Sequence, residues 1–327
     1  MNRRPLGQTG LNLTAIGFGG GGIGGLYRAV SQPDADSTMG RAWELGIRYF
    51  DTAPFYGFGL SERRIGDFLR QYPRDSFVLS SKVGRLLRPT TDIPDHGFVD
   101  PLPFRPDYDY SYDGVMRSVE DSLQRLGLNR IDILYVHDIG AHTHGANAAA
   151  HLRALMSGGL KALDELRSAG RIGAVGLGVN EVEVCLEVMK GFRLDCLLLA
   201  NRYTLLDRSA SSELIPECER LGVALIVGGV FNSGILATGA VPGAHFEYGP
   251  ASQAVLDRVS RLERVAAHHG VPLAAAALQF PFRNPVTASV LIGTARPESL
   301  TRNLALLDTK IPDAAWPEFD RAVLSPL

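Results

Sequence analysis

A single (β/α)8 barrel, with residues 1–327 forming one domain, is the fold that this sequence predicts on three observations. Short apolar runs rich in β-branched residues alternate with longer amphipathic stretches along the whole chain. There are eight such runs, each followed by a helix candidate, which matches the eight strand–helix units of this barrel. A length of 327 residues suits the fold, since such barrels typically use about 250 residues or more as one domain.

The apolar runs are predicted to be the barrel strands. Their apolar residues stand at successive positions rather than alternating, as expected for parallel strands that are buried on both faces. The eight predicted strands are 14–18, 47–51, 77–82, 131–137, 172–180, 196–201, 223–229 and 289–293.

The amphipathic stretches are predicted to be helices on the outside of the barrel. Several end in glycine, the residue favoured just past a helix C-terminus. They include 34–46, 61–71, 112–127, 160–170, 181–191, 211–222 and 255–270. Two connections on the βα side are long, the Pro- and Asp-rich segment 84–110 and the segment 138–157. Loops on this side build the active site in such a barrel.

The composition indicates an ordinary globular protein. It is 45% hydrophobic and 21% charged with a formal net charge of -2, so neither a nucleic-acid-binding patch nor an acidic tail is predicted. No stretch approaches the roughly 18 apolar residues of a membrane span, and MNRRPLGQTG lacks the apolar run of a signal peptide. The three cysteines, an odd and sparse set, favour a reducing compartment. We expect a cytoplasmic protein with a small-molecule substrate, and no helix shows an apolar outer stripe that would predict an oligomeric state.

The stretch GFGGGGIGG (17–25) contains the pattern G-x-G-x-x-G of dinucleotide-binding domains. That pattern requires a helix that starts at the glycines, whereas Pro33 precedes the first plausible helix here. We therefore expect the stretch to be the first βα loop, whose glycines let the backbone approach a flat ring. For Gly24 and Gly25, a merely flexible connection stays open as an alternative interpretation.

Polar residues at the carboxyl ends of barrel strands face a common site. Here they are Asp51, Lys82, His137, Asn180 and Asn201. Tyr56 follows Asp51 by five residues, on the loop that leaves the second strand. A carboxylate keeps a buried lysine charged, and that lysine is expected to lower the pKa of a neighbouring tyrosine from its usual value near 10. Such a tyrosine transfers protons at moderate pH, beside a neutral histidine that binds a substrate oxygen.

Each of these residues also has a structural interpretation when taken alone. Asp51 and Lys82 would form a structural ion pair, and His137 would be a satisfied core residue. Asn180 would cap a helix that starts at Glu181. The co-occurrence of four residue types that one mechanism needs, at positions facing one mouth, favours the catalytic interpretation.

The stretch HDIGAHTHG (137–145) offers a different chemistry, with His137, Asp138, His142 and His144 as ligands of a barrel metallohydrolase. Such loose loop spacing dictates no ligand geometry, and a hydrolase leaves Tyr56 and Lys82 unexplained. We therefore expect a solvated loop and no metal. A third class, a barrel that senses a cofactor without turnover, is disfavoured by the intact set of four residues.

Four blocks carry a resemblance to a known family, namely FDTAPFYG (50–57), SSKVG (80–84), IDILYVHD (131–138) and GLGVN (176–180). In order and spacing they resemble blocks of the aldo-keto reductase superfamily, over nearly the whole chain. The resemblance implies that Tyr56 is the general acid/base and that Asp51, Lys82 and His137 complete a catalytic tetrad. It also implies a nicotinamide cofactor.

Five further stretches resemble the branch that holds D-threo-aldose 1-dehydrogenases, L-fucose dehydrogenases and pyridoxal 4-dehydrogenases. They are LPF (102–104), DYSYDGVMRSVEDSLQRLG (109–127), RYTLLD (202–207), FNSGILA (231–237) and VPLAAAALQFP (271–281). The resemblance implies oxidation of a cyclic hemiacetal carbon to a lactone, with L-fucose or another D-threo-aldose oxidised at C1. The alternatives are oxidation of pyridoxal to 4-pyridoxolactone and general aldehyde or ketone reduction.

The same resemblance implies the cofactor contacts. Asn180 and Asn201 would hold the nicotinamide carboxamide, and the loop 228–234 would wrap the pyrophosphate. Relatives carry an aromatic residue where Gly228 stands, and Phe231 is the candidate replacement. The segment 292–303 resembles the adenosine-binding segment. The implied cofactor-binding residues are Asn180, Asn201, Gly229, Phe231, Ser233, Gly293, Thr294, Arg296 and Asn303.

The choice between NAD and NADP depends on charge partners for the 2′-phosphate. Relatives that prefer NADP often carry basic residues where Gly293 and Ser299 stand, and losing both removes those partners. We therefore expect NAD, with NADP possible through Arg296. Tyr27 and Phe55, with the segments 84–110 and 138–157, are expected to shape the substrate pocket.

Overall fold

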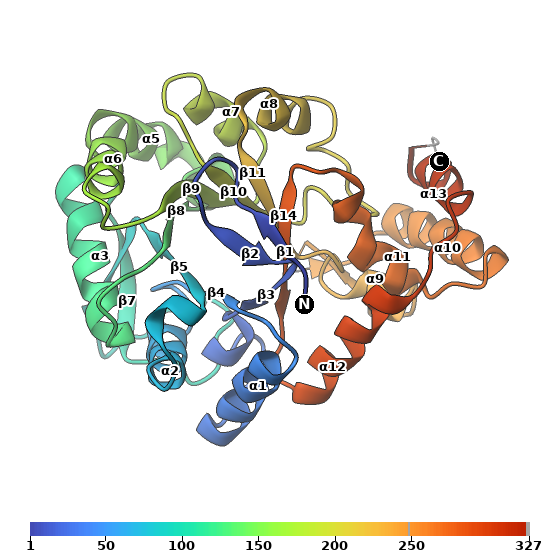
Figure 1. The fold of residues 1–327 in the computed structure, drawn as a ribbon, viewed down its shortest axis with the longest axis horizontal. Coiled ribbons are helices and arrows are strands. Elements are labelled where there is room, and N and C mark those ends of the chain that lie inside the picture. Colours follow the sequence, from blue (N-terminus) through green and yellow to red (C-terminus); the bar gives the residue numbers. More distant parts are fainter. Residues whose placement is uncertain (248, 325–327) are drawn as a thin grey trace.

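The computed structural model describes residues 1–247 and 249–324, and its centre is a closed barrel of eight parallel strands (Figure 1). The strands follow the order β10-β11-β14-β3-β4-β5-β8-β9 around the barrel. Every predicted strand overlaps one of them, so the predicted fold class is confirmed. They are β3 (Ile16–Gly19), β4 (Tyr49–Asp51), β5 (Val78–Val83), β8 (Ile133–His137), β9 (Ala174–Val179), β10 (Cys196–Ala200), β11 (Ala224–Gly228) and β14 (Thr287–Gly293).

Helices surround the barrel close to the predicted ranges. They are α1 (Gln32–Glu44), α2 (Leu60–Leu69), α3 (Tyr112–Leu126), α6 (Leu160–Ser168), α7 (Glu183–Met189), α8 (Leu214–Leu221), α10 (Gln253–His268) and α12 (Pro297–Ala305). The side chains of Ser31, Ser111 and Ser252 cap α1, α3 and α10 by accepting a hydrogen bond from a backbone N–H in the first turn. Gly127 and Gly222 end α3 and α8 in the left-handed conformation that glycine favours.

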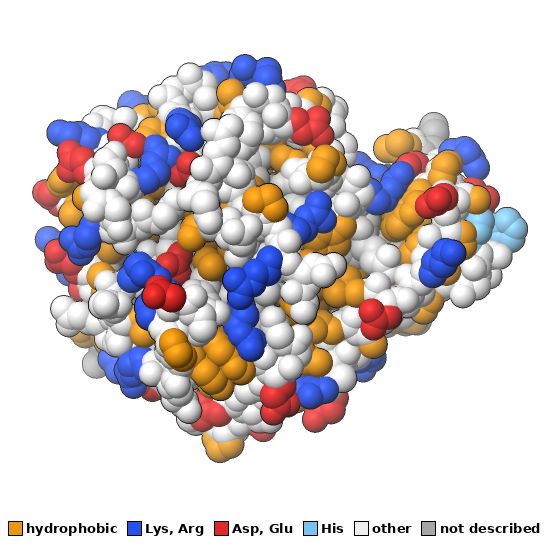
Figure 2. All heavy atoms as spheres, in the orientation of Figure 1, with side chains coloured by type: hydrophobic (Ala, Val, Ile, Leu, Met, Phe, Trp, Pro, Cys, Tyr) orange, Lys and Arg blue, Asp and Glu red, His pale blue; other side chains and the backbone are white. Residues whose placement is uncertain are grey.

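Further helices lie outside the repeating pattern, among them α9 (Ile235–Thr238), α11 (Leu273–Gln279) and α13 (Ala315–Leu324). The Arg261 side chain of α10 donates to the carbonyl of Ala322 on α13 at 2.9 Å. These two helices project from one side of the barrel (Figure 1), and Figure 2 shows acidic, basic and apolar side chains mixed over the projection. No helix in the described part of the chain has the length and apolarity to cross a membrane.

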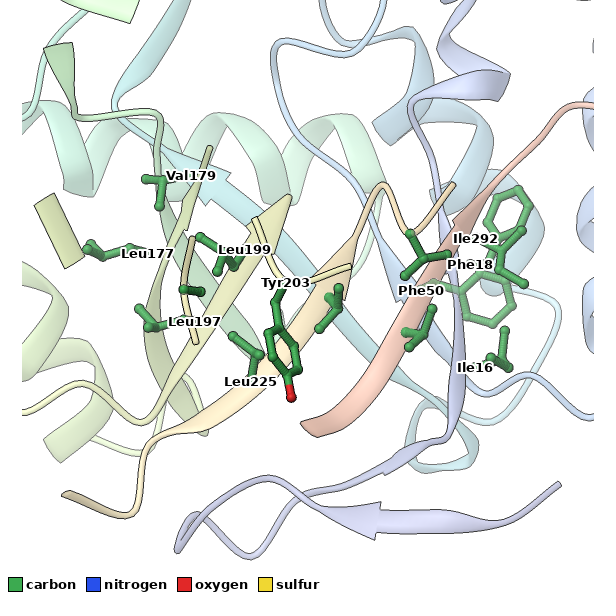
Figure 3. Packing of buried hydrophobic residues seen from close by; sticks show 14 of the residues in the cluster. Ile16, Phe18, Phe50, Leu177, Val179, Leu197, Leu199, Tyr203, Leu225 and Ile292 are labelled. Atoms are coloured by element: carbon green, nitrogen blue, oxygen red, sulfur yellow. The ribbon is translucent and has the colours of Figure 1, made fainter. Parts of the chain in front are cut away.

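Both faces of the barrel strands are buried, which explains their unbroken apolar runs. Leu177, Val179, Leu197, Leu199 and Leu225 point outward into the layer beneath the helices (Figure 3). Alternate residues fill the inside of the barrel: Tyr49, Ile133, Tyr135, Cys196, Leu198 and Ile226. The hairpin of β1 (Arg3–Pro5) and β2 (Asn12–Thr14) adds Leu6 and Leu13 to this inner cluster, just before β3 begins. The amino end of the barrel is thereby closed, and the site lies at the opposite end.

The two long connections are more ordered than expected. Segment 84–110 contains an antiparallel hairpin of β6 (Arg85–Pro89) and β7 (Phe104–Tyr108). Segment 138–157, expected to be a loop, is largely helical, with α4 (Ala141–His144) and α5 (Ala148–Ala154) leading into α6. The alanines at 148–150 explain the difference, because alanine has the highest helix propensity of all residues.

Candidate active site

The four residues of the predicted tetrad lie together at the carboxyl end of the barrel. Asp51 ends β4, Lys82 lies on β5, His137 ends β8 and Tyr56 stands on the loop after β4. Lys82 Nζ donates to Asp51 Oδ2 at 2.7 Å and to the Thr52 carbonyl at 2.9 Å. It also lies 4.8 Å from the centre of the Tyr56 ring. The lysine is 1% exposed and the aspartate 2% exposed, so this pair is buried.

The tyrosine does not have the lowered pKa that the sequence suggested. Burial alone would lower the pKa of Lys82, but the Asp51 carboxylate and the Tyr56 hydroxyl raise it above its ordinary value. The same burial raises the pKa of Tyr56 to about 12, although the positive charge of Lys82 opposes this rise. The expected lowering of the Tyr56 pKa is therefore wrong, because the loss of hydration destabilises the phenolate more than the positive charge of Lys82 stabilises it. Tyr56 carries its proton at neutral pH.

His137 is neutral, as expected. Burial, followed by the positive charges of Arg85 and Lys82, holds the pKa of His137 well below its usual value. The His137 and Tyr56 rings are perpendicular, with centroids 5.9 Å apart. Tyr110 donates its hydroxyl to the His137 carbonyl at 2.7 Å, which helps to hold the end of β8 in place.

The loop that carries Tyr56 rests on the glycine-rich segment. No helix starts at these glycines beyond one 3-10 turn (Gly22–Gly24), so the dinucleotide-binding interpretation is rightly set aside. A Cβ on Gly24 would lie 3.0 Å from the Tyr56 carbonyl carbon. Gly25 has φ +93°, and a Cβ there would lie 2.5 Å from the Val99 carbonyl oxygen. Gly25 is therefore required by close approach and by its backbone conformation, and a side chain on Gly24 would be tightly packed against the Tyr56 backbone, so these glycines are more than a flexible connection.

A cavity of about 620 Å³ opens beside Tyr56 and His137. Phe55 and Tyr27, the predicted substrate residues, line it, and Tyr27 is 64% exposed at its rim. The tip of the 84–110 segment closes one side, since Tyr27 N–H donates to the Gly97 carbonyl at 2.8 Å. The remaining walls include His96, Phe98, Tyr108, Arg85 and Asp138.

A second cavity, a groove of about 550 Å³, meets the first at Tyr56, which lines both. Of the predicted cofactor residues, it is lined by Gly229, Gly293, Thr294 and Arg296. A Cβ on Gly21 would meet no atom within 4 Å, and one on Gly293 would come no closer than 3.6 Å to the Gly19 carbonyl oxygen. The glycines thus leave an open floor, and this groove next to the acid/base candidate fits a nicotinamide dinucleotide.

The other predicted cofactor residues are not among those that line the groove. Asn180 lines the substrate cavity, and its Oδ1 accepts from Asn201 Nδ2 at 3.3 Å, so this pair is brought together. Asn180 does not cap α7, which begins at Glu183 with Val182 as its N-cap. Phe231, Ser233 and Asn303 are not among the lining residues of either cavity, and Phe231 packs against the core instead.

The histidine-rich stretch is not the solvated loop that we expected. His144 is 9% exposed, and its Nε2 lies 2.9 Å from the Tyr110 hydroxyl. Because that hydroxyl gives its proton to the His137 carbonyl, His144 serves as the donor to it. Among the described residues, the ligand atoms close enough to share a metal ion belong to His268, His269 and Glu318, at the end of α10 and on α13.

Arg85 and Asp138 lie in the two segments that were expected to shape the substrate pocket, but the sequence indicated Asp138 only as a candidate metal ligand and did not single out Arg85. Arg85 Nη2 donates to Asp138 Oδ2 at 2.6 Å, and the arginine is 3% exposed. Each residue stands close in sequence to a tetrad member, Arg85 three residues after Lys82 and Asp138 next to His137. That proximity is a signal in the sequence that could have singled them out within these segments.

The chain is similar to known proteins over nearly its whole length. A pyridoxal 4-dehydrogenase of Microbacterium luteolum is 46% identical over 326 residues, covering 96% of this chain and 95% of that protein. A D-threo-aldose 1-dehydrogenase of Pseudomonas sp. is 38% identical over 324 residues, covering 97% and 96%. The holo form of an aldo-keto reductase from Bacillus halodurans shares the fold, with a TM-score of 0.78 at 23% identity over 98% of this chain and 96% of that one. Residues 15–323 match the model of the aldo/keto reductase family. The chain therefore belongs to the aldo/keto reductase family, whose members are oxidoreductases that use nicotinamide cofactors.

Proposed function

We propose that this protein oxidises the hemiacetal carbon of a small cyclic substrate, an aldose or pyridoxal, to a lactone. The observation that carries the proposal is the position of Tyr56, where the aromatic cavity meets the glycine-floored groove. The reaction takes a proton from the substrate hydroxyl and a hydride from the carbon that bears this hydroxyl. The acid/base residue and the cofactor must therefore both reach that carbon, which is possible where the two cavities meet. The names of the two relatives support this class of reaction.

The four clustered residues divide the work of proton transfer. Tyr56 is the general acid/base: the fraction of Tyr56 that is ionised, which grows as the pH rises toward its pKa of about 12, accepts the proton of the substrate hydroxyl, and Lys82 stabilises this phenolate at short range. Asp51 keeps Lys82 charged and in place through the 2.7 Å hydrogen bond. Neutral His137, which lines the same cavity, orients the substrate oxygen.

The groove residues Gly229, Gly293, Thr294 and Arg296 would hold the cofactor. When bound, the nicotinamide supplies the acceptor for the hydride. We propose NAD, because neutral Gly293 and Ser299 stand where a 2′-phosphate would need positive charge. Titration should then give a lower Kd for NAD than for NADP, and the reverse order would contradict this choice. The three buried free thiols support the cytoplasmic location that we also propose.

The test of the proposed reaction is cofactor reduction, followed by absorbance, with pyridoxal, L-fucose, D-arabinose, L-xylose and L-galactose. Turnover of at least one hemiacetal, with the lactone identified by mass spectrometry, would support the proposal. A protein that binds NAD with no turnover of any of them would contradict it. General aldehyde or ketone reduction would then be examined with NADH.

A further inference from the structure

Three side chains suited to binding a metal ion meet where α10 and α13 pack together. His268 is the last residue of α10, His269 follows it, and Glu318 lies in the first turn of α13. Their ligand atoms, one from each residue, all lie within 4.8 Å of one another. None of the three residues lines the substrate cavity or the groove, so their role is separate from the proposed reaction.

The end of α10 brings the two histidine rings together. Consecutive residues of an α-helix point about 100° apart around the helix axis. His269, however, is the C-cap residue, with φ -92° and ψ 2°, and Gly270 after it has φ +63°. The backbone therefore leaves the helical path at this point, and the centroids of the two rings lie 4.7 Å apart at 50°.

The antiparallel packing of α10 and α13 brings Glu318 to the same place. The Arg261 side chain of α10 donates to the Ala322 carbonyl of α13 at 2.9 Å. Two turns further along α10, the histidines meet the first turn of α13. These helices form the projection from the barrel, and Figure 2 shows histidine side chains at its outer end.

The carboxylate stands at the distance from each ring that two ligands of one metal ion have. His268 Nδ1 lies 3.3 Å from Glu318 Oε2, and His269 Nε2 lies 3.2 Å from Glu318 Oε1. Two ligand atoms of a tetrahedral zinc ion, each about 2.0–2.2 Å from the metal, are about 3.3 Å apart. The two ring nitrogens, within 4.8 Å of each other, must approach further, and the 70% exposed side chain of His268 has room to turn.

Without an ion, the same groups form hydrogen bonds with one another. Those from His268 and, after it, His269 lower the pKa of Glu318, so its carboxylate is ionised at neutral pH. Hydrogen bonds of such exposed pairs contribute little to stability. A cation that accepts lone pairs from all three groups therefore replaces them at little loss.

The donor set selects the kind of ion. Imidazole together with carboxylate suits zinc and the neighbouring transition metals, whereas Mg²⁺ and Ca²⁺ prefer oxygen ligands alone. We propose that His268 Nδ1, His269 Nε2 and Glu318 bind a divalent transition-metal ion such as Zn²⁺, which ties α13 to the end of α10. Each imidazole then carries its proton on its other ring nitrogen. The His269 side chain is 13% exposed and its Nε2 faces Glu318, so the ion enters past the exposed His268.

The first test is calorimetric titration of Zn²⁺ into the full chain, purified without a histidine tag and freed of metal with a chelator. One equivalent should bind. Glu318→Gln and His268→Ala should each raise the Kd at least about 10- to 100-fold, which is the loss that even the hydrogen-bond partners of metal ligands cause. His142→Ala, which removes an exposed histidine of the stretch 137–145, is the matched control and should leave the Kd unchanged.

Three results of this titration would overturn the site. They are the absence of saturable Zn²⁺ binding, an unchanged Kd in Glu318→Gln or in His268→Ala, and a Kd that His142→Ala raises as much as they do. Competition tests the ligand chemistry, because about a hundredfold excess of Mg²⁺ should leave Zn²⁺ bound. Displacement by Mg²⁺ would overturn the assignment of imidazole ligands.

The second test measures whether the ion holds α13. At a Zn²⁺ concentration about ten times the Kd, openings that break the site become about tenfold rarer. Amide hydrogen exchange in 315–324 should slow by about that factor in the unmodified protein and stay unchanged in Glu318→Gln, with α2 as the internal control. Exchange in 315–324 that bound Zn²⁺ does not slow would overturn the link between the helices. Neither test depends on turnover, so failure here leaves the proposed function untouched.

Discussion

Lys82 Nζ and Asp51 Oδ2 are 2.7 Å apart in a place from which water is almost excluded. Ser80 donates its hydroxyl to the other oxygen of the same carboxylate at 2.7 Å. Lys82 thus balances the charge of the Asp51 carboxylate, and Ser80 satisfies the carboxylate oxygen that Lys82 does not contact. The Lys82 charge is maintained beside Tyr56 because Asp51 and Tyr56 raise the lysine pKa, although burial alone would lower it.

Breaking this pair should destabilise the protein strongly. Asp51→Asn and Lys82→Met each leave one buried charge without its partner, and we expect each to lower the free energy of unfolding by about 3–5 kcal/mol. The double variant should lose much less than the sum, because no charge is left unpaired. Urea denaturation measures all three. Lys161→Met in the exposed pair with Glu165 is the control and should change stability by less than about 1 kcal/mol. Additive losses would contradict the coupling.

Removing the Tyr56 hydroxyl should separate chemistry from binding. Tyr56→Phe keeps the ring that packs 6.5 Å from Phe98, so the cavity should retain its shape. We expect kcat to fall about 10²- to 10⁴-fold while the Kd of NAD changes little. Steady-state rates and fluorescence titration provide the two values. Retention of wild-type kcat would exclude Tyr56 as the acid/base.

Stability should decline between pH 6.5 and pH 4 partly because of His144. Burial, then the charges of His151 and Arg85, lowers the pKa of His144 to about 4 in the folded protein. As the pH falls, His144 of the unfolded chain is protonated near pH 6.5, whereas His144 of the folded chain is protonated only near pH 4. The stability contribution of neutral His144 is therefore fully present above pH 6.5 and is lost as the pH falls from 6.5 to 4. Urea denaturation at several pH values should show a shallower slope for His144→Asn than for exposed His142→Asn. Equal slopes for the two variants would exclude this assignment.

A methyl group on the floor of the groove should hinder the cofactor without unfolding the barrel. The Cβ of Gly293→Ala would come no closer than 3.6 Å to the Gly19 carbonyl oxygen, so stability should stay within about 0.5 kcal/mol. Because the methyl group occupies space in the groove, the Kd of NAD should rise about tenfold or more, which corresponds to about 1.4 kcal/mol. Gly40→Ala on α1, which meets no atom within 4 Å, is the control and should leave the Kd unchanged. Equal Kd values for the two variants would place the cofactor elsewhere.

Prediction from the sequence succeeded for the strands, because burial on both faces leaves a continuous run of apolar residues in the local sequence. All eight strand segments were found because strands such as β9 and β10 are buried on both faces. It failed where the environment depends on distant contacts. The burial of His144 depends on Tyr110, whose hydroxyl lies 2.9 Å from His144 Nε2, and on the ring of Tyr108 at the end of β7.

The sequence by itself determined the barrel and the strand-end positions of Asp51, Lys82 and His137, since the ends of parallel strands meet at one edge. Only the tertiary structure decided the protonation of Tyr56, whose pKa follows from its burial. It also brought Gly24 and Gly25 under the loop of Tyr56 and the 84–110 segment. Finally, it placed Arg85 and Asp138 together as a hydrogen-bonded pair in the cavity wall. Periodicity and residue type reflect the conformational preference of a short stretch of backbone. The hydration of a side chain and its hydrogen bonds depend instead on residues that are distant in the sequence and meet only in the folded chain.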